Sequence, residues 1–193
     1  MAFTNYTTFV ATVANYLGRD DLTSVIPDFV ELGQHRMTRD LRVQEMLKSA
    51  TASTVAGDST IAFPSDMLEV RDIHISGNPH YELEYQTPNQ FYKNNNATTS
   101  GTPRYYTMLG QEFQFAPVPD GTKTVQILYY AKPTFISSSN ASNVFLANFP
   151  DALLYATLAE AEPYLVNDDR IQTWASLYDR ACLLYTSPSP RDS

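Results

Sequence analysis

The feature that most constrains the fold is a change in the spacing of apolar residues, from helical at both ends of the chain to alternating in the middle. The apolar residues near the N-terminus recur at the spacing of one helix face: Phe9, Val13, Tyr16 and Leu17. Thr4 or Asn5 is placed to cap this helix, and Gly18 suits the position just past its end. The chain is therefore predicted to begin with a short amphipathic helix.

Helical spacing continues after this first helix and returns near the C-terminus. A second helix is predicted to begin between Ser24 and Pro27 and to extend to about Leu41. A later helix is predicted to begin at Phe149-Pro150-Asp151, with Pro163 as its kink or break. Asp168 or Asp169 is then placed to cap a last helix whose apolar residues are Ile171, Trp174, Leu177 and Tyr178.

Between these helices, apolar and polar residues alternate as they do in half-buried strands. Met67 to Ile75 reads as a long strand. Tyr81 to Tyr85 is predicted to place Tyr81, Leu83 and Tyr85 on one buried face and two glutamates on the other. Two further predicted strands form a hairpin around Gly110, and one more alternates through Val125, Ile127 and Tyr129.

This order predicts an α+β protein in which the N-terminal and C-terminal helices pack together around a central antiparallel β module. We expect N-terminal helices in residues 1–50, the β module in 51–135 and C-terminal helices in 136–181. The first and third segments would form one helical domain.

Residues 182–193 depart from the helical pattern before them. They resemble the in-frame translation of a transposase adaptor used to prepare sequencing libraries, since TGTCTCTTATACACATCT encodes Cys-Leu-Leu-Tyr-Thr-Ser, the residues that begin at Cys182. We therefore expect 182–193 to be non-native, with the natural sequence beyond about Ala181 replaced. The remainder contains no cysteine, which excludes disulfides and thiol catalysis there.

The charge balance bears on the possible partners. Lys and Arg number 13 and Asp and Glu number 21, which gives a formal net charge of −8. A protein that grips nucleic acid neutralises phosphates with positive charge, so this balance argues against that role. It suits a surface past which DNA slides, and equally an ordinary soluble protein. We expect no secretory signal and no membrane span, because the sequence shows neither pattern.

The sequence offers little for chemistry. His35, His74 and His80 lie on separate predicted elements without metal-ligand spacing, and the common nucleophile and nucleotide-binding motifs do not occur. The acidic doublets Asp20-Asp21 and Asp168-Asp169 lie at predicted helix starts, where carboxylates interact favourably with backbone N–H groups. We therefore predict no catalytic residue, no metal site and no cofactor.

Candidate contact residues come from one helix and from the aromatic residues. Three arginines recur on the second helix, either as a partner surface or as a solvated face paired with its own acidic residues. Tyrosine combines a flat apolar ring with a polar tip, which suits subunit contacts, sugar binding and core packing alike. The candidate interface residues are Arg36, Arg39, Arg42, Tyr92, Tyr105 and Trp174.

Several short segments form an ordered series along the chain. It begins with Ile26-Pro27-Asp28-Phe29-Val30-Glu31-Leu32, which leads to Arg39-Asp40-Leu41-Arg42. The later segments are Phe63 to Glu69, Ser100 to Tyr106, Phe115 to Gly121, Tyr129 to Ala131, Phe149 to Ala156, Asn167 to Arg170, and Trp174. In this order, and over nearly all of the chain up to about Ala181, the series resembles the head-to-tail adaptor, or connector, family of short-tailed bacteriophages.

The resemblance implies a structural virion protein without catalytic activity. It implies a dodecameric ring bound beneath the portal protein, which continues the DNA channel and carries the tail nozzle protein. The partners would be these two proteins and neighbouring copies of the chain, with DNA passing without sequence-specific binding and no membrane involved. The location would be the neck of the virion, assembled in the cytoplasm of the bacterial host. In this family the C-terminal part commonly docks with the portal, and that part would be replaced here.

Two alternatives come from other classes of function. A carbohydrate-binding or receptor-binding phage tail module is suggested by the tyrosine-rich β region and its acidic side chains, and glycan binding would identify it. A small hydrolase would need two close carboxylates in a cleft, which the sequence gives no reason to expect.

Overall fold

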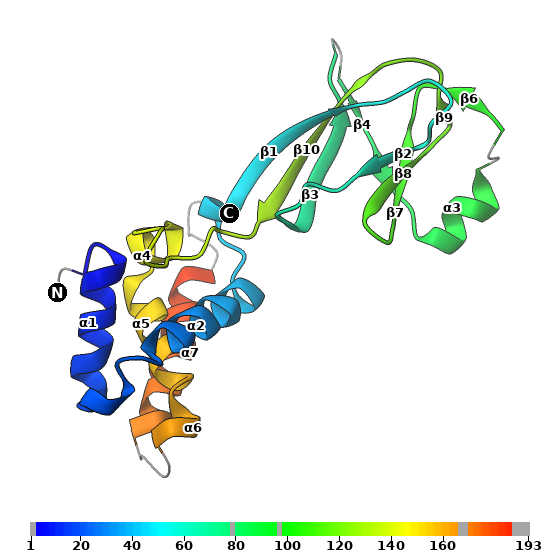
Figure 1. Cartoon of the computed structure of the whole chain (residues 1–193). Coiled ribbons are helices and arrows are strands. Elements are labelled where there is room, and N and C mark those ends of the chain that lie inside the picture. The colour runs from blue at the N-terminus through cyan, green and yellow to red at the C-terminus, as the bar shows by residue number, and fades with distance from the viewer. Residues whose placement is uncertain (1–2, 78–79, 96–97, 166–169, 187–193) are drawn as a thin grey trace. The chain divides into compact units, whose positions relative to one another are not determined.

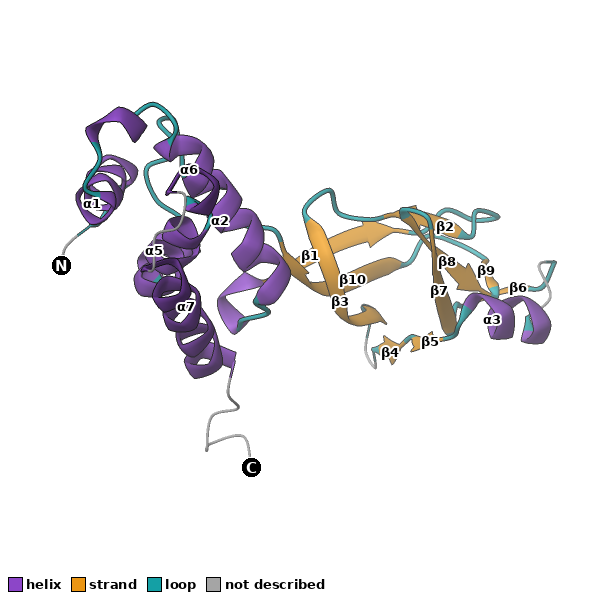
Figure 2. Ribbon diagram, turned by 90° about the horizontal axis from the view of Figure 1, so that it is seen from below, coloured by secondary structure: helices purple, strands orange, loops and turns teal. Residues whose placement is uncertain are grey.

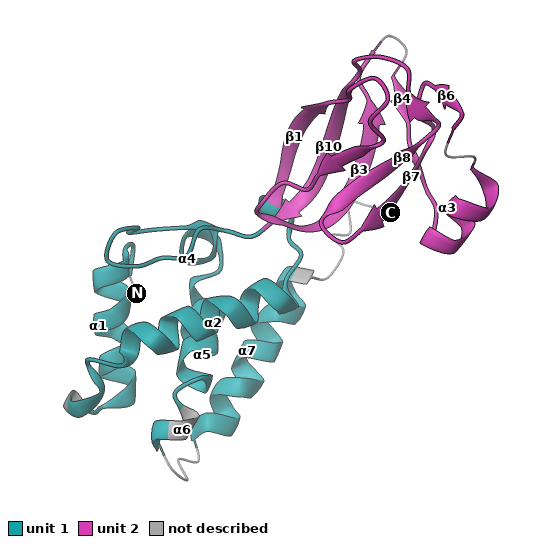
Figure 3. Ribbon diagram, turned by 45° about the vertical axis from the view of Figure 1, so that its right-hand side comes forward, with its two compact units in different colours: residues 1–46, 132–193 teal, residues 47–131 magenta. Residues whose placement is uncertain are grey.

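The computed structural model describes residues 3–77, 80–95, 98–165 and 170–186 and divides the chain into two compact units (Figure 3). The helical unit comprises residues 1–46 and 132–193, and the β unit comprises residues 47–131. The fold is therefore α+β, with the N-terminal and C-terminal helices in one unit and the sheets between them in sequence, as predicted. The β unit begins at Leu47 and ends at Ala131. Both boundaries lie earlier in the sequence than the boundaries 51 and 135 that the apolar pattern indicates.

The helical unit is built around α5 (Pro150–Ala159), which contacts helices from both ends of the chain. Its buried residues lie on all sides of the helix, so α5 is a core helix rather than an amphipathic surface helix. Around it lie α1 (Tyr6–Leu17), α2 (Ile26–Asp40), α4 (Val144–Asn148) and α7 (Arg170–Thr186), as Figure 1 shows. The shorter elements of this unit are η1 (Asp20–Leu22), η2 (Gln44–Met46) and α6 (Glu162–Leu165).

The helix ends follow the local signals in the sequence. Asn5 caps α1, because its Oδ1 accepts from the Thr8 N–H at 2.9 Å while the Thr8 hydroxyl accepts from the Asn5 N–H. Gly18 ends α1 in the left-handed conformation, with φ 65°. The predicted start of α2 is confirmed, with Pro27 in its first turn. The predicted break is confirmed ahead of Pro163, whereas Asp168 and Asp169 lie outside the described residues.

The β unit contains two four-stranded sheets and a small two-stranded pair (Figure 2). The first sheet has the order β1 (Leu47–Ser53), β10 (Thr124–Ala131), β3 (Met67–Ile75) and β4 (Tyr81–Glu82), and its pairs are antiparallel. The second has the order β2 (Thr60–Ala62), β8 (Glu112–Ala116), β7 (Tyr105–Leu109) and β5 (Glu84–Tyr85). The third pairs β6 (Ser100–Gly101) with β9 (Val118–Pro119), and α3 (Pro88–Asn94) completes the unit.

The core of the β unit consists of residues that the alternation places inward. Val125, Ile127 and Tyr129 of β10 are buried, and they belong to one cluster with Phe113 and Phe115 of β8. The predicted hairpin is confirmed by the antiparallel β7–β8 pair, with Gly110 at φ 60° in its turn. The β module is antiparallel except for the short β5–β7 and β6–β9 pairs, which are parallel.

The prediction for Tyr81 to Tyr85 is wrong. The segment is split into β4, which pairs with β3, and β5, which pairs with β7 of the other sheet. Only Leu83, at the crossing between the two sheets, is buried, whereas Tyr81 and Tyr85 are exposed. Alternation over five residues indicates the faces of one strand, but it does not reveal that the chain changes sheets.

The expectation that the helical pattern ends before Cys182 is also wrong, because α7 continues to Thr186. In this last turn the Tyr185 ring lies 4.6 Å from the Phe149 ring, measured between centroids, and its hydroxyl donates to Asp151 at 3.0 Å. The origin of residues 182–193 stays a prediction, and 187–193 lie outside the described residues.

Gly33 lies where α2 packs tightly against α5. A Cβ atom at this position would lie 2.9 Å from the backbone nitrogen of Thr157 and 2.9 Å from its Oγ1. We predict that Gly33→Ala lowers the free energy of unfolding by about 1–2 kcal/mol, because the clash outweighs the gain in helix propensity. Urea denaturation followed by circular dichroism measures this. Gly121→Ala is the control, since no heavy atom lies within 4 Å of its added Cβ, and an equal loss in both variants would contradict the explanation.

Asp66 connects β1 to β10 in the β unit. Its Oδ2 lies 2.7 Å from Lys48 Nζ, and its Oδ1 accepts from the Tyr129 hydroxyl at 2.9 Å. The hydrogen bond from Lys48 holds the pKa of Asp66 below its ordinary value of 3.8, while burial and the bond to Asp66 raise the pKa of Tyr129 to about 12. The Asp66 carboxylate therefore stabilises the folded state above its unfolded pKa.

We predict that this stabilisation is lost as the pH falls from about 4 through the lowered pKa of Asp66, because the unfolded state then binds the proton more readily. Thermal unfolding measured at several acidic pH values should show a smaller decline in Tm for Asp66→Asn than for the unchanged protein. Asp120→Asn, which removes an exposed partner of Lys123, is the control. Identical declines for the unchanged protein and Asp66→Asn would contradict the prediction.

Candidate functional site

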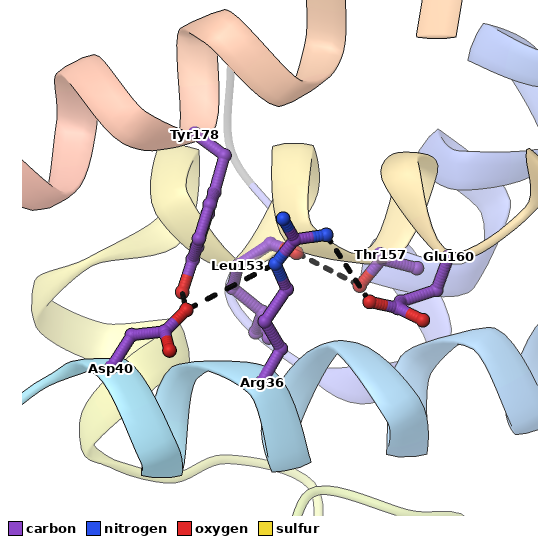
Figure 4. Close-up of polar contacts among 6 residues, drawn as sticks. All are labelled: Arg36, Asp40, Leu153, Thr157, Glu160 and Tyr178. Atoms are coloured by element: carbon purple, nitrogen blue, oxygen red, sulfur yellow. Dashed lines mark hydrogen bonds and ion pairs between the residues drawn. The ribbon is translucent and has the colours of Figure 1, made fainter.

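Arg36 lies inside a polar cluster that joins three helical segments (Figure 4). Its Nη1 is 3.3 Å from Glu160 Oε1, at the end of α5, and its Nε is 4.0 Å from Asp40 Oδ2 on α2 itself. Its guanidinium also lies 4.9 Å from the centre of the Tyr178 ring on α7. Arg36 therefore binds its own chain, and its side chain is only 30% exposed.

Tyr178 completes this cluster from α7. Its hydroxyl donates to Asp40 Oδ2 at 2.8 Å, and the residue is 2% exposed. Burial, with hydrogen bonds to Cys182 and Asp40, raises the pKa of Tyr178, so the hydroxyl stays protonated and remains a donor. The cluster therefore links α2 to α7 and to the end of α5, and its groups are paired with one another as in a structural contact.

Arg42 and Arg39 differ from Arg36 and from each other. Arg42 Nη1 donates to the carbonyl oxygens of Thr38 at 2.7 Å and Leu41 at 2.8 Å, so its charge lies at the C-terminal end of α2, where cations are favourable. Arg39 is exposed and forms no ion pair with any residue that the structure describes. Leu32, one heptad earlier on the same helix face, is 48% exposed. Of the three arginines, Arg39 is the one open to a partner.

The aromatic candidates also separate. Trp174 is 6% exposed and lies under the Arg170 guanidinium at 5.1 Å, so it is a core residue of the helical unit. Tyr92, on α3, is 57% exposed and donates to Gln114 Oε1 at 2.7 Å. Tyr105, on β7, is half-buried and lines a concave surface. The six candidates thus form no single site, and they are divided between the two units.

Two concave surfaces were not indicated by the sequence. One, of about 600 Å³, lies in the helical unit and is largely apolar; its lining includes Tyr16, Leu146, Pro150, Leu154 and Tyr155. The other, of about 550 Å³, lies in the β unit and mixes aromatic with charged side chains: Tyr81, Glu82, Glu84, Arg104 and Tyr105. Each gathers residues from distant parts of the sequence, so no local motif marks them.

Titratable groups gather in one place that the sequence did not indicate. The rings of His74 and His80 lie 5.4 Å apart between centroids, and His74 Nδ1 is 2.9 Å from Asp72 Oδ2. Among the described residues, however, no three His, Cys, Asp or Glu side chains are placed to hold a metal ion. Asp21, the second residue of η1, forms an ion pair with Arg19, and no side chain caps that element.

The comparisons with known proteins bear on the whole chain. The family model described as SU10 adaptor protein matches residues 4–188. The chain belongs to the SU10 adaptor protein family. The match agrees with the phage adaptor resemblance carried by the ordered segments, and it extends beyond Ala181. No curated protein matches the sequence. No helix in the described part of the chain is long and apolar enough to cross a membrane.

The different surroundings of Arg36 and Arg39 predict different effects of the same substitution. Arg36→Ala should lower the free energy of unfolding by about 1–3 kcal/mol, because it removes the cation over the Tyr178 ring and leaves Glu160 without its partner. Arg39→Ala should change it by less than about 0.5 kcal/mol. Urea denaturation of both variants measures this. Equal losses in the free energy of unfolding would show that Arg36 does not link the helices.

Proposed function

We propose that this chain is a structural, non-enzymatic component of a phage virion, an adaptor whose copies form a ring between the portal protein and the tail nozzle protein. The observation that carries the proposal is the family match over residues 4–188, which covers both units. In this role the ring continues the DNA channel at the neck of the virion.

The proposal requires several separate contact surfaces on one subunit. In a closed ring each copy contacts its two neighbours through two different surfaces, and the portal and nozzle need further ones. The described structure offers distinct candidates: the exposed Leu32–Arg39 face of α2, the apolar concave surface beside α4 and α5, and the polar concave surface of the β unit. We assign the Leu32–Arg39 face to a protein contact, because arginine beside an exposed apolar side chain is typical of interfaces.

The charge of the chain is compatible with a DNA channel. A net charge of −8 provides no excess of cations to neutralise phosphates, so DNA would not be held by the protein as a whole. We propose that the surface facing the channel is net negative, which would let DNA pass without sequence-specific binding.

The test is assembly on a portal. The portal protein encoded in the same phage genome is mixed with the full chain, and separately with a version that carries the natural sequence in place of residues 182–193. Electron microscopy should show an added ring on the portal with at least one of the two, with a net negative lumen. Arg39→Glu should abolish the ring without loss of stability, whereas Arg180→Glu, an equal charge change at an exposed position on α7, should not. No ring with either version would overturn the proposal.

A second candidate is a carbohydrate-binding tail module, and the observation that favours it is the concave surface of the β unit. Exposed Tyr81 next to Glu82, Glu84 and Arg104 combines an aromatic ring with polar groups, as sugar-binding surfaces do. Glycan binding that is lost in Arg104→Ala, together with no assembly on the portal, would favour this function over the adaptor.

A further inference from the structure

Strand β1 is the open edge of the first sheet. The strand order places it outermost, paired on one side with β10, and Figures 1 and 3 show no described strand on its other side. Its residues Leu47 to Ser53 pair with Tyr130 to Thr124 without a register shift. A regular edge of this length is a template for a further strand.

The other long edge in the described part of the β unit is protected. Outside its short pairing with β4, strand β3 has register irregularities opposite Leu128/Tyr129 and Tyr130/Ala131, and it carries Glu69, Arg71 and Asp72. Bulges and charges are the usual means by which proteins prevent edge pairing. In β1, Leu-Lys-Ser-Ala-Thr-Ala-Ser, there is no proline and no bulge, and the one charge is Lys48.

The hydrogen bonds next to β1 show which of its backbone groups face outward. The N–H of Thr54 donates to Lys123 O at 2.9 Å, and the N–H of Ser76 donates to Thr124 O at 2.8 Å. Because backbone groups alternate in direction along a strand, those of Ser49, Thr51 and Ser53 point away from β10. None of these three residues takes part in another backbone hydrogen bond of the described chain, and their side chains are exposed.

We propose that β1 pairs with β1 of a second copy of this chain, antiparallel, about a two-fold axis at Thr51. In this register Thr51 meets its own counterpart and Ser49 meets Ser53, so every residue with outward backbone groups faces another of the same kind. The same register brings Val55, which is 62% exposed, opposite Leu47 of the second copy. The edge is thus complementary to itself.

The charges also favour a second copy. Lys48 would face Thr54 of the second copy, and the Lys48 of that copy lies six positions further along its strand, so the two Lys48 residues would be about 20 Å apart. Each is held by Asp66 of its own chain. Cross-strand pairs of Ser and Thr hydroxyls are favourable, and no like charges face each other. Since each copy carries a net charge of −8, added salt should strengthen the pair by screening repulsion.

This pairing does not rest on the adaptor function, because it concerns free copies without a portal. A two-fold contact uses the same surface on both partners, whereas a ring contact uses two different ones. Failure of one proposal therefore leaves the other intact.

The test is the mass of the full chain in solution by sedimentation equilibrium, over a range of protein and salt concentrations. The unchanged protein should reach twice the mass of one chain, at lower protein concentration when salt is added. Thr51→Lys and Thr51→Glu should each remain monomeric, because each places like charges in contact at the two-fold axis. An equimolar mixture of the two should recover the doubled mass, and Thr51→Val, which keeps the backbone donor, should behave as the unchanged protein.

A second pair of substitutions tests the register independently. Ser49→Lys combined with Ser53→Glu in one chain creates two opposite-charge pairs across the proposed axis, so it should shift dimerisation to a concentration lower by about 2- to 30-fold. Circular dichroism confirms that each variant is folded. A monomeric unchanged protein at every concentration, a dimer insensitive to both charges at position 51, or a mixture that stays monomeric would each overturn the proposal.

Discussion

The antiparallel pairing of β1 with β10 is the contact on which the rest of the structure depends. Leu47 lies opposite Tyr130, so the chain leaves the helical unit and returns to it at neighbouring points. Residues 1–46 and 132–186 can therefore form one core although the whole β unit separates them in sequence. The β unit is a long insertion between the two helical segments, and the pairing of its first and last strands holds its two ends together. Packing of the helices against each other therefore does not have to offset the entropy cost of closing a long flexible loop.

The returning segment is then fixed by a buried side chain of α2. Gln34 is fully buried, its Oε1 accepts from the Ile136 N–H at 2.7 Å, and its Nε2 donates to the Ile136 carbonyl at 3.3 Å. Asn143, which caps α4, donates to the same Oε1 at 3.0 Å. A buried amide stabilises a fold only when its polar atoms are paired, so this contact sets one position for the segment that leads to α4 and α5. Thus α2 has an inner face at Gly33 and Gln34 and an outer face at Leu32 and Arg39.

Much of this fold could be predicted from the sequence where a local signal coincides with the tertiary structure. Asn5 and Gly18 mark the ends of α1 because capping depends on neighbouring backbone groups alone. Strand β1 was not predicted, because Leu47 to Ser53 has neither clear apolar alternation nor strong strand formers and is extended through its pairing with β10. The prediction for Tyr81 to Tyr85 failed for a related reason. Its alternation is a local pattern, whereas its change from one sheet to the other depends on pairing with distant strands.

The candidate site shows the same limit more sharply. Arg36, Arg39 and Arg42 recur every third residue, which suggests a single face, yet each step turns the helix by about 60°, so the outer two are about 120° apart. Their surroundings accordingly differ: Arg36 contacts α5 and α7, Arg39 is exposed, and Arg42 lies at the end of α2. The spacing of the residues identified the helix. Only the packing of α5 and α7 against α2 shows which arginine is left open to a partner protein.

The symmetry of the contact between copies decides whether an open strand edge leads to unlimited growth of the sheet. If β1 joined a different edge of the next copy, each addition would expose a new β1, and the sheet would grow without limit unless the rotation closed it. Pairing of β1 with itself leaves no unpaired β1 in the product, so it ends at two copies. The protected edge of β3, with its irregular register and charges, disfavours the first arrangement. In the proposed pairing β1 can therefore stay unprotected without unlimited growth of the sheet, because the strand that closes the β unit meets only its own copy.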